Sequence, residues 1–191
     1  MNLCSEDVKL FYKLYQPLLI YFSRKFKITN GAKSPEELNL WEIIRLGDEL
    51  FEHPKLINSF IKENPYKFSK DELSIVRGWK NFVKGELVVY RYLKKYTIFL
   101  DIREPPKAYG VLGLESPPKD ILGPLIPRTA QTVLIPFKGK IIYGFLEPYN
   151  IFLRGGIRHS VDEIYQEAKD RFGIITSLPF SAKKRKAILK N

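Results

Sequence analysis

One segment of the chain combines aromatic and basic residues in a pattern that could bind nucleic acid. Residues 84–96 read Lys-Gly-Glu-Leu-Val-Val-Tyr-Arg-Tyr-Leu-Lys-Lys-Tyr, and the residues that could make contacts are Tyr90, Arg91, Tyr92, Lys94, Lys95 and Tyr96. Aromatic rings can stack on bases while Lys and Arg neutralise phosphates. The alternative is packing, because tyrosines in a row on a strand are often half-buried.

The local pattern predicts a strand followed by a turn at Lys94-Lys95. On a regular strand Val88, Tyr90 and Tyr92 share one face, because side chains alternate between the two faces. The RNA-recognition signature also begins with Lys-Gly, but it requires aromatic residues where this chain has Glu86 and Val88. The match to that signature therefore fails at the stacking positions.

The C-terminal tail is the second basic feature. Five of residues 181–191 are Lys or Arg and none is acidic, and Lys183, Lys184, Arg185 and Lys186 are consecutive. The net charge is +11, but residues 1–84 hold 14 Lys/Arg against 11 Asp/Glu and residues 85–180 hold 13 against 10. The body is thus only mildly basic. The tail is either a solubilising terminus or an anchor that contacts a polyanion such as nucleic acid.

No pattern of catalytic or metal-binding residues stands out. The two histidines, His53 and His159, have no neighbouring nucleophile or orienting acid in the sequence. Together with Cys4 they lie too far apart for the ligand spacing of a transition-metal site. We therefore expect no metal and no cofactor, and the sequence names no catalytic residue.

Two short motifs fit enzyme signatures only formally. Ser116–Lys119 fits S-x-x-K, but its two central prolines favour a turn. Glu167–Lys169 fits half of a nuclease signature, but it falls in a predicted helix as a solvated face. Standard phosphate-loop motifs do not occur. An enzyme whose acids, such as Asp101 and Glu104 beside Arg103, converge with distant residues stays an alternative.

The sequence predicts a cytoplasmic protein without a membrane partner. A single cysteine cannot form an internal disulfide. The strongest apolar run, Leu10–Phe22, is interrupted by Lys13, Gln16 and Pro17 and is shorter than the roughly 20 residues of a membrane span. No basic segment precedes it, so a signal peptide is not expected.

Helical periodicity dominates the first 84 residues, and alternation dominates the rest. Helix starts are predicted at Ser5, at Ser34 with Glu37, at His53-Pro54 and at Ser69 with Glu72. Strands are predicted over Leu87–Leu93, Tyr96–Leu100, Ala108–Leu114, Thr132–Phe137, Lys140–Leu146 and Asn150–Leu153, with the clearest hairpin turn at Lys138-Gly139. A last helix is expected over Ser160–Phe172.

These elements predict an α+β fold, with a bundle of about four helices packed on a mostly antiparallel sheet. The expected regions are a helical part (1–84), a β-rich part (85–180) and the basic tail (181–191). No flexible linker separates the first two, so we expect them to pack together.

The C-terminal half also resembles a family of uncharacterised prokaryotic proteins. The resemblance is carried by Gly110–Leu114, Leu134–Tyr143 and Gly173–Pro179. The family pattern has Tyr-Asp-Gly where this chain has Tyr143-Gly144-Phe145, so an acid is missing here. The resemblance implies a shared fold and no particular activity.

Three functional hypotheses follow from the sequence. The first is a non-catalytic binding or interaction protein, for which a homodimer is one option. The second is a nucleic-acid-associated protein that uses the Tyr90–Tyr96 hairpin and the tail. The third is an enzyme without a recognisable motif. We expect the functional surface in the β-rich part, at its junction with the helices.

Overall fold

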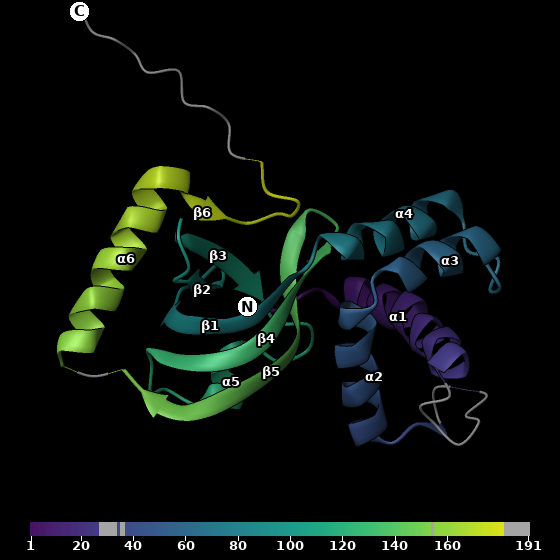
Figure 1. Cartoon of the computed structure of the whole chain (residues 1–191), viewed down its shortest axis with the longest axis horizontal. Coiled ribbons are helices and arrows are strands. Elements are labelled where there is room, and N and C mark those ends of the chain that lie inside the picture. The colour runs from purple at the N-terminus through teal and green to yellow at the C-terminus, as the bar shows by residue number, and fades with distance from the viewer. Residues whose placement is uncertain (27–33, 35–36, 154, 182–191) are drawn as a thin grey trace, which may run out of the picture.

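A computed structural model describes residues 1–26, 34, 37–153 and 155–181 of the chain (Figure 1). The basic residues Lys183–Lys186 lie outside this part. An N-terminal helical region, a mostly antiparallel sheet and a late C-terminal helix follow one another, so the predicted α+β class is confirmed.

The helical region consists of α1 (Ser5–Phe26), α2 (Leu40–Glu52), α3 (Lys55–Glu63), α4 (Lys70–Gly78) and the 3₁₀ turn η2 (Trp79–Asn81). The capping box predicted at Ser69 is present at the start of α4. Residues 35 and 36 of the helix start predicted at Ser34 lie outside the described residues, and the Glu37 amide donates a hydrogen bond to the Ser34 carbonyl. Helix α2 begins later because Asn39 accepts a hydrogen bond from the Glu42 amide and Glu42 accepts one in return.

The β-rich region contains β1 (Val83–Tyr92), β2 (Thr97–Asp101), β3 (Lys107–Leu112), α5 (Pro118–Leu122), β4 (Arg128–Phe137), β5 (Lys140–Phe152), α6 (Gly156–Phe172) and β6 (Ile174–Ile175). The predicted hairpin turn is correct, and Lys138 and Gly139 both have positive φ, as a two-residue turn of this kind requires. The segment predicted as a separate strand at Asn150 instead continues β5, and α6 begins one turn before Ser160.

Five of the strands close into a barrel. Strand β1 pairs antiparallel with β2 and β4, β2 pairs with β3, β4 pairs with β5, and β3 runs parallel to β5. The circular order is therefore β1-β2-β3-β5-β4, with α5 between β3 and β4 and the short β6 outside on β3. This connectivity is that of a five-stranded OB-type Greek-key barrel.

Three packed layers hold the fold together. The barrel interior contains Leu87, Val89, Phe99, Tyr109, Val111, Leu122, Ala130, Leu134, Ile141 and Tyr143. The outer face of β4 and β5 packs on the helical region, where the rings of Phe11 and Phe137 are 5.7 Å apart. Helix α6 covers the outer face of β1, β2 and β3 (Figure 1). The helices and the barrel therefore share one core, as the absence of a linker predicted.

None of the described helices combines the length and the apolar character needed to cross a bilayer.

Candidate nucleic-acid interface

A β-bulge in β1 changes which face the predicted tyrosines occupy. Val89 pairs with Phe99 but Arg91 pairs with Ile98, so the register shifts at Tyr90. Tyr90 belongs to the cluster beneath α6, whereas Tyr92 packs against the barrel interior. The prediction that Tyr90 and Tyr92 share a face is wrong, because the extra residue of a bulge inverts the alternation beyond it.

Tyr90 serves as a contact between the barrel and α6. Its ring centroid is 4.5 Å from that of Tyr165, and its hydroxyl donates a 2.7 Å hydrogen bond to Asp162. Burial, reinforced by the bond to Asp162, raises the pKa of Tyr90 to about 12. A ring enclosed in this way leaves no face for a base.

The two residues that follow Tyr90 also make internal contacts. The guanidinium of exposed Arg91 lies 4.8 Å from the Tyr90 ring centroid and donates a hydrogen bond to the Tyr90 hydroxyl. The Tyr92 hydroxyl donates to the carbonyl of Gly123, and burial raises the pKa of Tyr92. Tyr92 therefore closes one end of the barrel.

Tyr96 has a different environment, because its ring lies against the main chain of Gly110 on β3. A β-carbon on Gly110 would be 3.0 Å from Cγ and Cδ1 of Tyr96 and 3.1 Å from Cδ2. Three ring atoms at nearly equal distances mean that the ring faces the glycine. Tyr96 is partly buried, because it also packs against the cluster beneath α6. The absence of a side chain at Gly110 thus creates a supported aromatic platform on the outer barrel surface.

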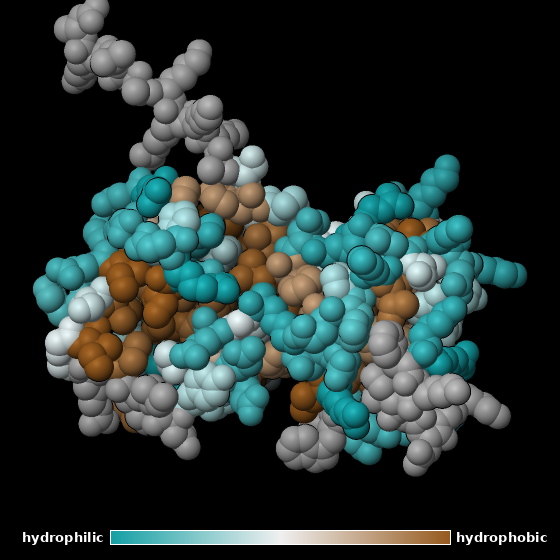
Figure 2. Space-filling model, in the orientation of Figure 1, coloured by the Kyte–Doolittle hydropathy of each residue, from teal (hydrophilic) through white to brown (hydrophobic). Residues whose placement is uncertain are grey.

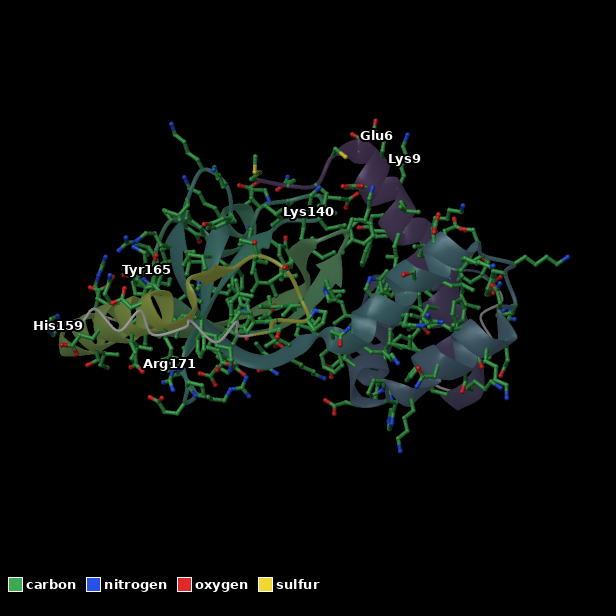
Figure 3. The ribbon with its side chains drawn as sticks, turned by 90° about the horizontal axis from the view of Figure 1, so that it is seen from above. Glu6, Lys9, Lys140, His159, Tyr165 and Arg171 are labelled. Carbon is green, nitrogen blue, oxygen red and sulfur yellow. The ribbon has the colours of Figure 1, made fainter. Side chains whose placement is uncertain are left out.

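The parallel pairing of β3 with β5 brings Lys140 beside this platform. Val111 is opposite Ile141, so Gly110 and Lys140 are the residues that immediately precede this pair on the two strands. Ile141 points into the barrel and Ile142 points outward, which places Lys140 on the outer face by alternation. In Figure 3, Lys140 lies between the start of α1, marked by Glu6 and Lys9, and α6, marked by Tyr165.

Asp7 of α1 holds two lysines of the β4–β5 hairpin. Its carboxylate is 2.5 Å from Nζ of Lys138 and 2.9 Å from Nζ of Lys140. The Asp7 side chain is 7% exposed, whereas those of Lys138 and Lys140 are 45% and 44% exposed. Hydrogen bonds from Lys138 and then Lys140 lower the pKa of Asp7. Two ammonium groups share one carboxylate, so the hairpin keeps a net positive charge.

The β1–β2 loop supplies further cations on the other side of Tyr96. Lys94 and Lys95 are exposed and have no hydrogen-bond or ion-pair partner among the described residues. Their loop is closed by a hydrogen bond from the Leu93 amide to the Tyr96 carbonyl. We call the set Lys94, Lys95, Tyr96, Gly110, Lys138 and Lys140 the Tyr96 surface.

Sequence reasoning identified half of this surface. It named the lysines and tyrosine of the hairpin, and it recognised Lys138-Gly139 as a turn without assigning it a function. The proximity of Gly110 and Lys140 comes from the parallel β3–β5 pairing, which joins segments about 30 residues apart. A Gly in the middle of a predicted strand was the one available signal of close approach by another group.

The other residues considered for chemistry do not form a catalytic arrangement. His53 and His159 lie near glutamates on their own helices, 3.7 Å from Glu49 and 3.3 Å from Glu163 respectively. Within the described ranges, no three His, Cys, Asp or Glu residues are grouped as a metal site would require.

The acids that the sequence suggested for an enzyme either contact residues close to them in the sequence or are exposed to solvent. Asp101 is buried and accepts hydrogen bonds from the main chain and the guanidinium of Arg103. Glu104 is exposed in the following loop. Glu167 forms an exposed ion pair with Arg171 on α6, consistent with a solvated helix face.

Comparisons with protein-family models, with curated proteins and with solved structures find no match to this chain. The resemblance of the C-terminal half to uncharacterised prokaryotic proteins therefore stays a prediction. Any assignment of function has to come from the geometry of the molecule itself.

Proposed function

We propose that this protein is a non-catalytic binding protein whose ligand is single-stranded nucleic acid, bound on the Tyr96 surface. The observation that carries the proposal is the ring of Tyr96 supported on Gly110, with Lys94 and Lys95 in its own loop and Lys140 on the adjoining strand. Stacking on the ring requires a base that is not already stacked in a duplex. The lysines would contact phosphates on both sides of that base.

The barrel type adds an argument by analogy. In OB-type barrels the face of strands 2 and 3, with the loops between strands 1 and 2 and between strands 4 and 5, binds oligonucleotides or oligosaccharides. Lys94 and Lys95 belong to the first of these loops, and Lys138 to the second. A shared fold does not establish a shared function, so the residues themselves support the proposal.

Helix α6 limits the proposed surface to one end of that face. It covers Tyr90, Ile98 and Ala108, and Tyr96 packs against the edge of this cluster while keeping part of its surface exposed. We therefore expect a short binding site, with contacts to only a few nucleotides and a weak preference among bases, because every base has a face that can stack.

The test measures binding of a fluorescently labelled oligonucleotide of about 12 nucleotides to the full-length chain over a series of salt concentrations. Tyr96→Ala should weaken binding about 5- to 100-fold, the range expected for loss of one stacked base. Tyr149→Ala removes an exposed tyrosine from another part of the barrel and should change little. A duplex of the same sequence should bind more weakly than the single strand.

The same assay distinguishes the contribution of Lys94 and Lys95 to oligonucleotide binding from that of the basic tail. Replacing Lys94 and Lys95 by Ala should lower the slope of log K against log salt by about 0.7 for each lost phosphate contact. The matched control replaces Lys62 and Lys70, two exposed lysines of the helical region, by Ala. Replacing Lys183–Lys186 by Ala in the full-length chain tests whether the tail binds by itself. The proposal fails if only this last variant loses binding, or if no oligonucleotide binds.

A further inference from the structure

A groove lies between α2 and β5, separate from the Tyr96 surface. Its volume is about 840 Å³, within the usual range of ligand sites. We call it the α2–β5 groove. It is lined by Ile44, Arg45, Asp48 and Glu52 of α2, Lys84 of β1, Ile121 of α5, Gln131 of β4 and residues 143–148 of β5. Figure 2 shows apolar surface where the barrel meets the helical region near α2.

Two exposed isoleucines give the groove its apolar character. Ile44 is 41% exposed and Ile121 is 47% exposed, and they belong to different elements, α2 and α5. Partly buried Phe145 and Leu146 lie between these elements in the same lining. An incoming apolar side chain could therefore contact apolar groups from three elements at once.

An unpaired strand edge runs along the groove. Strand β5 is bonded to β4 along its length, but on its other edge only Ile141 and Ile142 pair with β3. Beyond them, no strand in the described part of the chain pairs with that edge of β5. The residues Gly144–Pro148 all line the groove. The β4–β5 register shifts between Thr132 and Leu134, so β5 has a bulge at Gly144 and Phe145. The groove therefore borders the edge of β5 that no described strand pairs with. The carbonyl of Phe145 accepts a hydrogen bond from the Thr132 hydroxyl, so a partner strand would use the other main-chain groups of this stretch.

Gly144 keeps the main chain of this edge open. A β-carbon at this position would be 2.6 Å from Cδ1 of Ile135 and 2.8 Å from Cγ1 of Val133, both of which are fully buried. The two side chains thus occupy the space that a side chain at Gly144 would need. The glycine itself is exposed. Gly144 thus lines the groove without a side chain of its own.

Some charged side chains of the groove form ion pairs with each other, and others have no partner in the described part of the chain. Nζ of Lys84 is 2.6 Å from carboxylate oxygens of both Asp48 and Glu52. Burial of Lys84 opposes its charge, but the bonds to these two acids outweigh that effect and raise its pKa. The side chains of Arg45 and Glu147, in contrast, have no hydrogen-bond or ion-pair partner among the described residues, and they line the groove from α2 and from β5.

We infer that the α2–β5 groove binds an extended segment of a partner polypeptide, which adds a short strand to the free edge of β5. Peptides that bind in this way obtain affinity from main-chain hydrogen bonds and specificity from pockets for alternate side chains. Here the segment would place an apolar side chain between Ile44 and Ile121, an acidic residue toward Arg45 and a basic residue toward Glu147. This binding does not depend on the proposed nucleic-acid function.

The test uses a displayed library of random seven-residue peptides, selected against the full-length protein. The enriched sequences should carry an apolar residue flanked by an acid and a base. A synthetic copy of one should shift the NMR amide resonances of residues 144–147 and leave those of Lys94 and Lys95 unchanged. If no peptide binds, the proposed binding of oligonucleotides to the Tyr96 surface is unaffected. If no oligonucleotide binds, the proposed binding of peptides to the α2–β5 groove is likewise unaffected.

Matched variants decide where the peptide binds. Ile121→Asp should weaken its affinity about tenfold or more, because a charge replaces an apolar contact. Ile157→Asp is the control, since Ile157 is 61% exposed on α6, outside the groove. Arg45→Glu should weaken binding, and a peptide whose acid is replaced by lysine should restore it. The inference is overturned if no sequence is enriched, if Ile121→Asp has no effect, or if the groove proves to be occupied by a second copy of the chain that the peptide cannot displace.

Discussion

The ring of Tyr96 lies directly against Gly110, with three ring atoms within 3.0–3.1 Å of where a β-carbon of residue 110 would be. This contact leads to a prediction about Gly110→Ala. The new methyl group should push the ring off β3, so oligonucleotide affinity should fall about as much as in Tyr96→Ala. The stability should change by no more than about 1 kcal/mol, because alanine also suits a strand better than glycine.

A double-mutant cycle makes this prediction specific. If both substitutions act through the same platform, the double variant Tyr96→Ala/Gly110→Ala should bind no more weakly than either single variant. Affinities from anisotropy titrations and free energies of unfolding from urea titrations supply the two measurements. Unchanged affinity in Gly110→Ala, combined with weak binding in Tyr96→Ala, would falsify the idea that the glycine positions the ring.

Asp7→Asn should change stability and binding in opposite directions. The substitution removes the carboxylate shared by Lys138 and Lys140, so the free energy of unfolding should fall by about 1–2 kcal/mol at neutral pH, allowing for the half-exposed lysines. The same change raises the positive charge of the Tyr96 surface, so oligonucleotide affinity at low salt should rise a few-fold.

The pH dependence of stability provides a second measurement on Asp7. Its pKa in the folded protein is lowered from 3.8 by the two lysines. A lowered carboxyl pKa stabilises the folded state above the unfolded pKa, and the stabilisation is lost as pH falls through the folded value. The wild type should therefore lose more stability than Asp7→Asn on acidification below about pH 4. Parallel stability profiles for the two proteins would show that the lysines do not stabilise the Asp7 carboxylate.

Some features of this fold and surface follow from short-range sequence signals. Ser69 with Glu72 marks the start of α4 because both capping bonds are made within four residues. Lys138-Gly139 marks the hairpin because its two residues must both take positive φ. Lys94 and Lys95 were correctly placed between two strands, in the loop from β1 to β2.

Other features depend on distant parts of the chain. The bulge at Tyr90 reverses the faces of the following residues, and it is fixed by pairing with β2 and by the packing of Tyr165 above it. The closure of the barrel depends on parallel pairing between β3 and β5, for which neither strand carries a local signal. The Tyr96 surface combines both kinds of feature. The sequence therefore revealed Lys94, Lys95 and Tyr96, but not the support of the ring by Gly110 or the nearby Lys138 and Lys140.

Tyr90→Phe distinguishes a structural tyrosine from a binding one. The variant removes the hydroxyl that donates to Asp162 and keeps the ring contact with Tyr165. The hydroxyl also accepts a hydrogen bond from Arg91, so we expect a loss of stability of about 1–2 kcal/mol and no change in oligonucleotide affinity. Hydrogen exchange should show faster exchange of α6 amides near Asp162. Weaker oligonucleotide binding in a variant that remains folded would contradict the assignment of Tyr90 to α6 packing.

Gly144→Ala tests how tightly β5 packs on β4. The methyl group would meet Cδ1 of Ile135 at 2.6 Å and Cγ1 of Val133 at 2.8 Å, and both side chains are enclosed by the shared core. Overpacking of this kind costs about 1–3 kcal/mol of stability.

Ile135→Val removes the nearer of the two clashing atoms and should relieve part of that cost. In the double variant the loss of stability should therefore be smaller than the sum of the two single losses. Thermal and urea unfolding of the wild type, Gly144→Ala, Ile135→Val and the double variant supply the free energies for this double-mutant cycle. Gly144→Asp, which introduces the acid of the family pattern that the C-terminal half resembles, should be at least as destabilising as the alanine. A fully stable Gly144→Asp variant would mean that β5 can shift its bulge to turn the new side chain into the α2–β5 groove.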